Sequence, residues 1–230
     1  MRVSIVTIFP DFFASVFDDG MIRVAREKGR LALDIVNLRD FTEDLHRTVD
    51  DTPFGGGPGM VMKIEPIDRA LRSLAVAPKG QRPPGQKVLL TSPQGRRFDQ
   101  GTAIAWSGLE HVVIVCGRYK GVDERVAEHL IDEEFSIGDF VLSGGEPAAL
   151  CVVDALARLQ PDVLGRFERA GVGFSIPTDD DAMRQWLPRL VGVHDAIEFR
   201  LGDLGAPSAS PNANRISLPN RFVMRSPPVA

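Results

Sequence analysis

The sequence predicts an α/β domain with a largely parallel sheet and helices on both faces. Apolar runs typical of strands alternate with segments of helical spacing through residues 2–160. This alternation is characteristic of parallel sheets, in which a helix carries the chain back between neighbouring strands. The chain has 230 residues, of which 43% are hydrophobic and 25% charged, so it is long enough to bury a substantial core.

The predicted elements follow one another along the chain. Apolar runs predict strands at residues 2–9, 31–36, 87–91 and 111–116. Helical spacing of apolar side chains predicts helices at residues 11–29, 65–75, 98–107, 122–131 and 148–159. The proline- and glycine-rich stretch 77–86 is expected to be a surface linker within the domain, and the stretch 132–150 begins like the end of a further strand.

Composition narrows the class of protein. No run of about 18 apolar residues is present, so no membrane span is expected. The first residues lack a basic flank and a small-residue cleavage site, so they are interpreted as a strand rather than a signal peptide. Both cysteines, Cys116 and Cys151, lie in apolar segments, which indicates small core residues in a reducing, cytoplasmic setting.

Charge gives weaker guidance about partners. The net charge of −4 argues mildly against a nucleic-acid partner, but the distribution of charge is more informative than its sum. Basic side chains gather locally at Arg39, His46 and Arg47, and again at 96–97. Solvated surface charge is the simpler interpretation of these groups, and a nucleic-acid surface is the alternative.

Three predicted strand ends in succession carry glycine, proline and polar residues, at 92–95, 117–121 and 136–145. Ligands of open α/β sheets bind outside the carboxyl ends of the strands, so three such loops predict a ligand site, with ordinary turns as the alternative. The stretch 132–150 is interpreted as the floor of that site. Its glycines let a ligand approach the backbone, and its apolar run at 140–142 would wall a flat aromatic ligand.

A second glycine-rich stretch lies in the long segment 39–62, which has little apolar periodicity. Residues 50–60 read Asp-Asp-Thr-Pro-Phe-Gly-Gly-Gly-Pro-Gly-Met, and the prolines favour one defined turn path over flexibility. No Gly-Lys-Ser/Thr follows, so the stretch is not a phosphate-binding P-loop. A loop this long is usually functional or disordered, but a purely structural role fits the pattern equally well.

Taken together, these motifs resemble one known family. They lie at residues 49–60, 90–95, 116–119, 121–126 and 136–146. In order and spacing they resemble the bacterial tRNA (guanine-N1)-methyltransferases, the TrmD family in the SPOUT class of knotted methyltransferases. The resemblance runs from residue 1 to about Gly165.

The resemblance implies a fold, a reaction and partners. It implies a trefoil knot at the C-terminal end of the sheet domain, with S-adenosyl-L-methionine bent into that knot. It also implies an obligate homodimer with the active site at the interface. The methyl group is expected to go to N1 of the guanosine 3′ to the anticodon, position 37 of tRNA. The implied domains are a methyltransferase domain at 1–160, a linker at 161–175, and a segment at 176–230 that replaces a small tRNA-binding helical domain.

The resemblance also assigns site residues. Arg158 matches the family arginine placed near the guanine, and the substrate loop that faces the partner corresponds to Asp50, Gly55, Gly57 and Gly59. Lys120 stands where many relatives carry Glu, so the sequence does not support a magnesium ion, and no metal ligand is assigned. The residues expected to bind S-adenosylmethionine are Leu90, Ser92, Pro93, Gly117, Tyr119, Ser136, Ile137, Gly138, Asp139, Phe140, Val141, Leu142, Gly144 and Gly145.

The chain departs from the family pattern after Gly165. The family's general-base aspartate would fall near Gly173, where no carboxylate is present, and its basic tRNA-gripping stretch is absent. Residues 166–230 contain no lysine and many helix breakers, which is typical of a poorly packed tail. We hypothesise a slip of reading frame near Gly165, which sequencing the gene there tests; a genuinely divergent segment is the alternative. The second functional interpretation is therefore an S-adenosylmethionine-binding dimer that no longer methylates.

Overall fold

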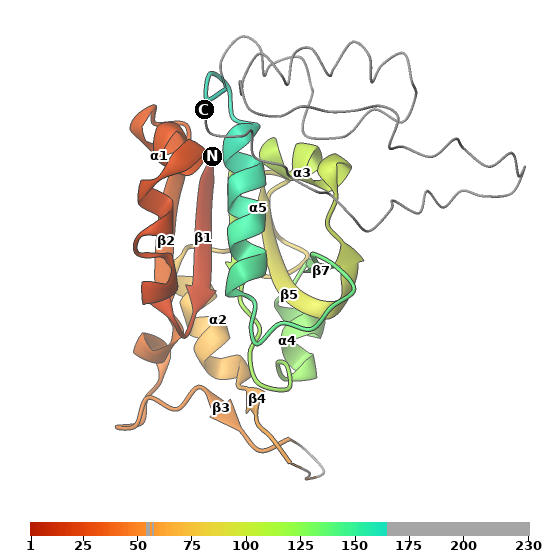
Figure 1. Ribbon diagram of the computed structural model, residues 1–230. Helices are drawn as coiled ribbons and strands as arrows, with labels where there is room; N and C mark the ends of the chain where they lie inside the picture. The colour runs from red at the N-terminus through yellow and green to blue at the C-terminus, as the bar shows by residue number, and fades with distance from the viewer. Residues whose placement is uncertain (54–55, 57, 165–230) are drawn as a thin grey trace, which may run out of the picture. The chain divides into compact units, whose positions relative to one another are not determined.

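The computed structural model describes residues 1–53, 56 and 58–164, and a five-stranded parallel sheet forms the centre of this part of the chain (Figure 1). The strand order is β2-β1-β6-β5-β7, and each neighbouring pair is parallel. The predicted parallel α/β class is confirmed. The strands are β1 Arg2–Thr7, β2 Ala32–Asn37, β5 Gln86–Arg97, β6 His111–Val115 and β7 Glu133–Ser136.

Helices cover both faces of this sheet, as predicted. One apolar core joins α1, α3 and α5 to one face, and a second core joins α2 and α4 to the other. In Figure 1, α5 crosses in front of the sheet between α1 and α3. The helices are α1 Gly20–Glu27, α2 Ile64–Ser73, α3 Gln100–Ser107, α4 Glu124–His129 and α5 Glu146–Arg158.

Alternation along the central strands divides their side chains between the two cores. On β1, Val3 and Ile5 belong to the core beneath α5, whereas Val6 belongs to the core beneath α2. Successive side chains of a strand point to opposite faces, so a strand covered on both faces requires a continuous apolar run. Ser4 and Thr7 are polar exceptions on β1, and both are fully buried.

The single helix predicted at residues 11–29 is wrong. The structure has two short 3₁₀ turns, η1 Pro10–Phe13 and η2 Val16–Asp18, before α1 begins at Gly20. Asp19 is extended, with φ −126° and ψ 167°, and Gly20 has φ +60°, so the backbone changes direction between the turns and the helix. The apolar side chains kept helical spacing because both turns and the helix bury one side against the same core.

Strand β5 continues past the end predicted at residue 91. Its partner β7 pairs through Phe135 with Thr91 and again with Arg96, so residues 92–95 form a bulge inside the strand. Gly95 permits this close approach, because a Cβ at that position would lie 2.3 Å from the Phe135 amide nitrogen. The predicted turn is therefore an interruption within one long strand.

The β3–β4 hairpin and the short turn η3 were not predicted from the sequence. Strands β3 Asp50–Asp51 and β4 Val61–Met62 form an antiparallel pair, the only hairpin in the described residues, that brackets the glycine-rich stretch. Each strand has two residues, too few to show an alternating pattern. The short 3₁₀ turn η3 Leu38–Phe41 precedes the hairpin.

The predicted linker at 77–86 is anchored to the domain by a buried arginine. The side chain of Arg82 is 6% exposed and pairs with Asp132. It also donates hydrogen bonds to the carbonyl oxygens of Ala77, at 3.0 Å, and Leu130, at 2.6 Å. The segment therefore lies on the surface, as expected, but with a fixed course.

The trefoil knot stays a prediction. The expected C-terminal segment at 176–230, and the linker at 161–175 beyond Leu164, lie outside the described residues. Within the part of the chain that is described, no helix combines the length and apolar character needed to cross a membrane.

Candidate functional site

Two of the three predicted loops meet at the carboxyl edge of the sheet, and Thr91 of β5 is at the centre of the junction. Its Oγ1 accepts a hydrogen bond from the Gly117 amide at 2.8 Å. The Gly145 amide in turn donates to the Gly117 carbonyl oxygen at 2.9 Å. Strand β5 and the loops that follow β6 and β7 are thus joined by one side chain and one peptide group. The first predicted loop, 92–95, is instead a bulge within β5, and ligand binding at this edge stays a prediction.

Contacts within the protein require glycine at this junction. A Cβ on Gly145 would lie 1.9 Å from Thr91 Oγ1, and one on Gly117 would lie 2.7 Å from the Thr91 carbonyl oxygen. Neither glycine has a positive φ, so close packing alone excludes a side chain. The sequence suggested that these glycines admit a ligand; the structure adds that they allow the loops to touch.

The apolar run of the third loop is exposed. Phe140, Val141 and Leu142 retain 57%, 92% and 39% of their accessible surface. Just before them, Ser136 Oγ donates to the Gly138 carbonyl oxygen at 2.9 Å and closes a tight turn. Exposed large apolar side chains beside ordered backbone are typical of a binding surface for a ligand or a partner.

A buried ion pair lies directly behind the junction. Glu146, the first residue of α5, has no exposed surface, and its Oε2 accepts from Arg118 Nε at 3.2 Å and Nη2 at 3.1 Å. Thr7 Oγ1 donates to the other carboxylate oxygen at 2.7 Å. Burial, followed by the Glu146 charge, raises the pKa of the neighbouring Cys116 thiol well above its ordinary value. Cys116 is therefore a neutral core residue, as predicted. The same prediction is wrong for Cys151, which lies on α5 and is exposed.

The predicted substrate hairpin is joined to the second loop through backbone hydrogen bonds. Lys120 donates its amide to the Met60 carbonyl oxygen at 3.0 Å, and the Met62 amide donates to the Gly121 carbonyl oxygen at 3.0 Å. Gly59 has φ +98°, and a Cβ there would lie 2.6 Å from Lys120 Cε. The stem of the Lys120 side chain thus lies against Gly59. Of the other predicted substrate glycines, Gly55 and Gly57 lie outside the described residues.

Tyr119 links the predicted cofactor and substrate residues. Its φ of +60° is rare for a residue with a side chain, and strained positions of this kind cluster at functional sites. Burial, and then the Asp50 carboxylate, raises the pKa of Tyr119, whereas Arg39 opposes this shift. Arg39 was visible in the sequence only as part of a basic group. The structure places it beside both residues.

Arg158 lies apart from the other predicted site residues along helix α5. The helix begins with Glu146 at the loop junction, and Arg158 is its last residue. A rise of about 1.5 Å per residue over twelve residues separates the two by roughly 18 Å. In Figure 1, α5 runs away from the loops towards the opposite end of the sheet. Within one chain, Arg158 is therefore remote from the cofactor loops.

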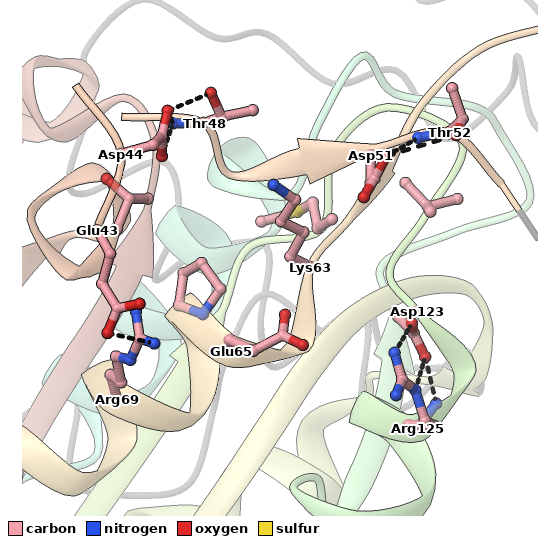
Figure 2. A pocket seen from close by; sticks show the side chains of 14 residues that line it. Glu43, Asp44, Thr48, Asp51, Thr52, Lys63, Glu65, Arg69, Asp123 and Arg125 are labelled. Carbon is pink, nitrogen blue, oxygen red and sulfur yellow. Dashed lines mark hydrogen bonds and ion pairs between the residues drawn. The ribbon is translucent and has the colours of Figure 1, made fainter. Parts of the chain in front are cut away.

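A cavity of about 460 Å³ lies against the outer side of the β3–β4 hairpin (Figure 2). Charged side chains line it, and four of them form two ion pairs: Glu43 with Arg69 at 2.7 Å, and Asp123 with Arg125 at 2.7 Å. Among the described residues, none of those predicted to bind cofactor or substrate lines this cavity. It is therefore a neighbour of the loop junction and not the predicted site itself.

The described residues contain no group of three or more His, Cys, Asp or Glu side chains that could hold a metal ion. Sequence analysis missed Thr91, Arg118 and Glu146 as individual site residues, although each lies inside a quoted motif. The signal in the sequence that could have identified Glu146 is its position: a charged residue directly after two glycines and at the start of an apolar helix. A charge in that position requires a partner, but the sequence does not name which one.

The fold and the joined loops define a parallel α/β protein with a candidate ligand site at the carboxyl edge of its sheet. The sequence model of one family, described as "tRNA (Guanine-1)-methyltransferase TrmD", matches residues 1–171. The chain belongs to this family, and the expectation from its motifs is confirmed.

Individual relatives agree with the family match. Over 170 residues, 74% of this chain, it is 51% identical to a protein of Koribacter versatilis and 52% identical to one of Methylococcus capsulatus. Both are named "tRNA (guanine-N(1)-)-methyltransferase". The matched region spans 64% and 66% of their lengths, slightly under two thirds.

A solved structure supports the same fold. The crystal structure of tRNA (m1G37) methyltransferase from Aquifex aeolicus matches with a TM-score of 0.65 and 34% sequence identity. The match covers 83% of this chain and 88% of that one.

Proposed function

We propose that this protein transfers a methyl group from S-adenosyl-L-methionine to N1 of guanosine 37, the nucleotide 3′ to the anticodon of tRNA. The observation that carries the proposal is the family match over residues 1–171, which contains all of the loops joined at Thr91. The names of the two relatives, and the structural likeness to the tRNA (m1G37) methyltransferase of Aquifex aeolicus, support the same reaction.

The residues at the carboxyl edge suit S-adenosylmethionine. Its adenine is a flat group with polar edges, and Tyr119, Phe140 and Leu142 offer exposed apolar or aromatic surface beside the loop backbones. We assign its binding to the fourteen residues from Leu90 to Gly145 that the family resemblance names. When bound, the cofactor supplies an electrophilic methyl group. The main task of the protein is then to hold donor and acceptor in line.

Guanine, the methyl acceptor, requires two further functional groups from the protein. Guanine N1 carries a proton that a general base must receive, and negative charge develops on O6 as that proton leaves. We assign Arg158 to stabilise O6, and Asp50 with the glycine loop at 55–59 to shape the guanine pocket. The expected position of the base, Gly173, lies outside the described residues. No metal ion is included in this assignment.

We further propose a homodimer with its active site at the interface. Arg158 is roughly 18 Å along α5 from the cofactor loops of its own chain, so a second copy would have to bring it to them. Exposed Phe9, Phe12 and Val16 offer apolar surface for such an interface, since each retains at least 38% of its accessible surface. As a tRNA-modifying enzyme, the protein would act in the cytoplasm.

Two measurements test this function. Titration calorimetry with S-adenosylmethionine is expected to detect binding, and transfer of labelled methyl groups is expected to a tRNA with guanosine 37. A transcript with adenosine 37 serves as the matched control and is expected to remain unlabelled. Binding without transfer would contradict the proposal and favour a cofactor-binding dimer, and absence of binding would remove both functions.

A further inference from the structure

We propose that the buried ion pair of Arg118 and Glu146 is a positioning device that sets the spacing of the two loops that hold the cofactor. These loops are 117–121 and 136–145. The inference rests on the proposed function, because that function makes S-adenosylmethionine their ligand. The family resemblance assigned neither residue a role, and neither is proposed to touch the cofactor.

The buried Glu146 carboxylate requires a cationic partner. Among the ion pairs of the described residues, only this one contains a carboxylate with no exposed side chain. A buried charge left without a partner is strongly unfavourable, and the helix N-terminus where Glu146 lies offers only partial compensation. The hydroxyl of Thr7 satisfies one carboxylate oxygen. Arg118 is the cation that satisfies the other, so Glu146 holds Arg118 in one place.

The side chain of Arg118 in turn is only 22% exposed and has three groups around it. Its Nε and Nη2 donate to Glu146, and its Nη1 donates to the Ser143 carbonyl oxygen at 3.0 Å. The Phe9 ring lies against the guanidinium, with Cζ 4.5 Å from the ring centroid. A planar guanidinium with three fixed contacts orients its backbone more tightly than a lysine would. The residues on either side of Arg118 are Gly117 and Tyr119, two of the proposed cofactor residues.

The Arg118–Glu146 ion pair also contacts the second cofactor loop, 136–145. A Cβ on Gly144 would lie 2.1 Å from Arg118 Nε and 2.6 Å from Glu146 Oε2, so the ion pair passes directly over this glycine. The next residue, Gly145, is hydrogen-bonded to Gly117. The ion pair and this hydrogen bond are two neighbouring ties between the same loops. Loss of either partner should let the loops separate.

The single tyrosine of the sequence provides a direct reporter of loop position, because Tyr119 follows Arg118. Protein containing 3-fluorotyrosine gives one fluorine resonance, whose shift and width are measured without ligand. The variants are Glu146→Gln, which removes the charge but keeps the shape, together with Arg118→Met and Arg118→Lys. Arg23→Met is the matched control, because it breaks the exposed Arg23–Glu27 pair on α1.

We expect the Tyr119 resonance to move or broaden in Glu146→Gln and Arg118→Met, with a smaller change in Arg118→Lys and none in the control. The Kd and KM for S-adenosylmethionine should rise about tenfold, because loops that are no longer held in place must be ordered when the cofactor binds, and this ordering lowers the affinity. At saturating cofactor, kcat should change less than KM. If Glu146→Gln does not fold, Thr7→Val, which leaves the ion pair in place, should change both readouts in the same direction but less.

Variants that melt at lower temperature while keeping the Tyr119 resonance and the cofactor affinity of the control would overturn the proposal, because the pair would then be merely structural. Failure of the unmodified protein to bind S-adenosylmethionine would instead refute the proposed function. The fluorine spectra would still decide whether the ion pair sets the position of the loop, so the two failures are distinguishable.

Discussion

Strand β1 carries a buried polar cluster at each end. At the amino end, Ser4 Oγ lies 2.9 Å from His111 Nε2 and donates to Asp34 Oδ2 at 3.1 Å. At the carboxyl end, Thr7 Oγ1 donates to Glu146 at 2.7 Å, and Glu146 pairs with Arg118. Both hydroxyls are fully buried, on opposite faces of the same strand.

The two clusters differ in what they connect. The partners of Ser4 belong to β2 and β6, which are already paired with β1 through their backbones. The side-chain partner of Thr7 is Glu146 of α5, and Glu146 in turn pairs with Arg118 in the loop after β6. Among the described residues, no strand pairing holds α5 or this loop. The first cluster therefore links strands that the sheet already holds together, whereas the second links α5 to a loop whose position we propose it sets. Substitutions at the two ends should have different consequences.

The largest effect is expected at the carboxyl end from Gly145→Ala. The new Cβ would lie 1.9 Å from Thr91 Oγ1 and 2.9 Å from the Cys116 backbone Cα, which cannot move cheaply. The loss in the free energy of unfolding should be about 3 kcal/mol or more, the upper end for overpacking. Urea denaturation measures this loss.

Gly108→Ala is the matched control for this substitution, because its Cβ would find no atom closer than 3.9 Å and its φ is −84°. It should be neutral or stabilise the fold by up to about 1 kcal/mol. Equal effects from the two glycine substitutions would refute the close packing of the loops at Thr91.

A smaller loss is expected for Thr91→Val, which keeps the shape of the side chain but removes the acceptor for the Gly117 amide. An unsatisfied buried donor costs about 1–3 kcal/mol. Hydrogen exchange should report faster exchange of the Gly117 amide, and calorimetry weaker cofactor binding. Thr91→Ser, which keeps the hydroxyl, should retain slow exchange at Gly117. Fast exchange in the serine variant would mean that the methyl group, and not the hydroxyl, holds the loop.

The amino end should respond to pH and leave the candidate site unchanged. Burial lowers the pKa of His111 below its ordinary 6.5, the Arg2 charge lowers it further, and Asp34 opposes both. The folded state therefore binds this proton less tightly than the unfolded state. The contribution of His111 to stability is complete above pH 6.5 and is lost as the pH falls through the lower folded pKa.

Unfolding free energies measured from about pH 7.5 to pH 5 should fall with a slope from this residue of at most about 1.4 kcal/mol per pH unit. His111→Gln should remove that part of the slope, which the difference between the two curves isolates. Cofactor affinity at pH 7.5 should not change. If the stability of both proteins depended on pH in the same way, His111 would not be the source of this part of the slope. If His111→Gln bound the cofactor less tightly, the amino end of β1 would also affect the candidate site, contrary to this prediction.

The smallest effect is expected on the surface, where Arg23→Met removes an ion pair at spacing i,i+4 whose side chains are 50% and 60% exposed. Such pairs contribute about 0.3–0.5 kcal/mol, and salt screens them. Chemical denaturation at low and high salt should detect a difference below about 0.5 kcal/mol that shrinks as salt is added. A loss above about 1 kcal/mol would disqualify this variant as the control for the buried pair.

Much of the fold could be predicted from local pattern. Fully apolar runs such as 112–115 indicate a strand covered on both faces, because no solvent-facing position interrupts them. The polar segments 117–121 and 136–145 were also expected to lie at one edge of the sheet, and the structure joins both of them to Thr91 of β5. The prediction failed at 11–29, where three short elements bury one side against the same core and so imitate one helix. It also failed at 92–95, where a bulge resembles a turn.

Periodicity and motif order are properties of neighbouring residues, so they were sufficient to predict the class of fold and the family. The contacts between distant segments were not predictable in this way: Thr91 joins the loops after β6 and β7, Thr7 and Arg118 are the partners of Glu146, and Arg158 lies at the far end of α5. Residues 7 and 146 meet because β1 and α5 pack together, and no local pattern records a contact across that separation. The same packing explains why Gly144 and Gly145 are glycine: the atoms that would collide with a side chain belong to Arg118 and Thr91.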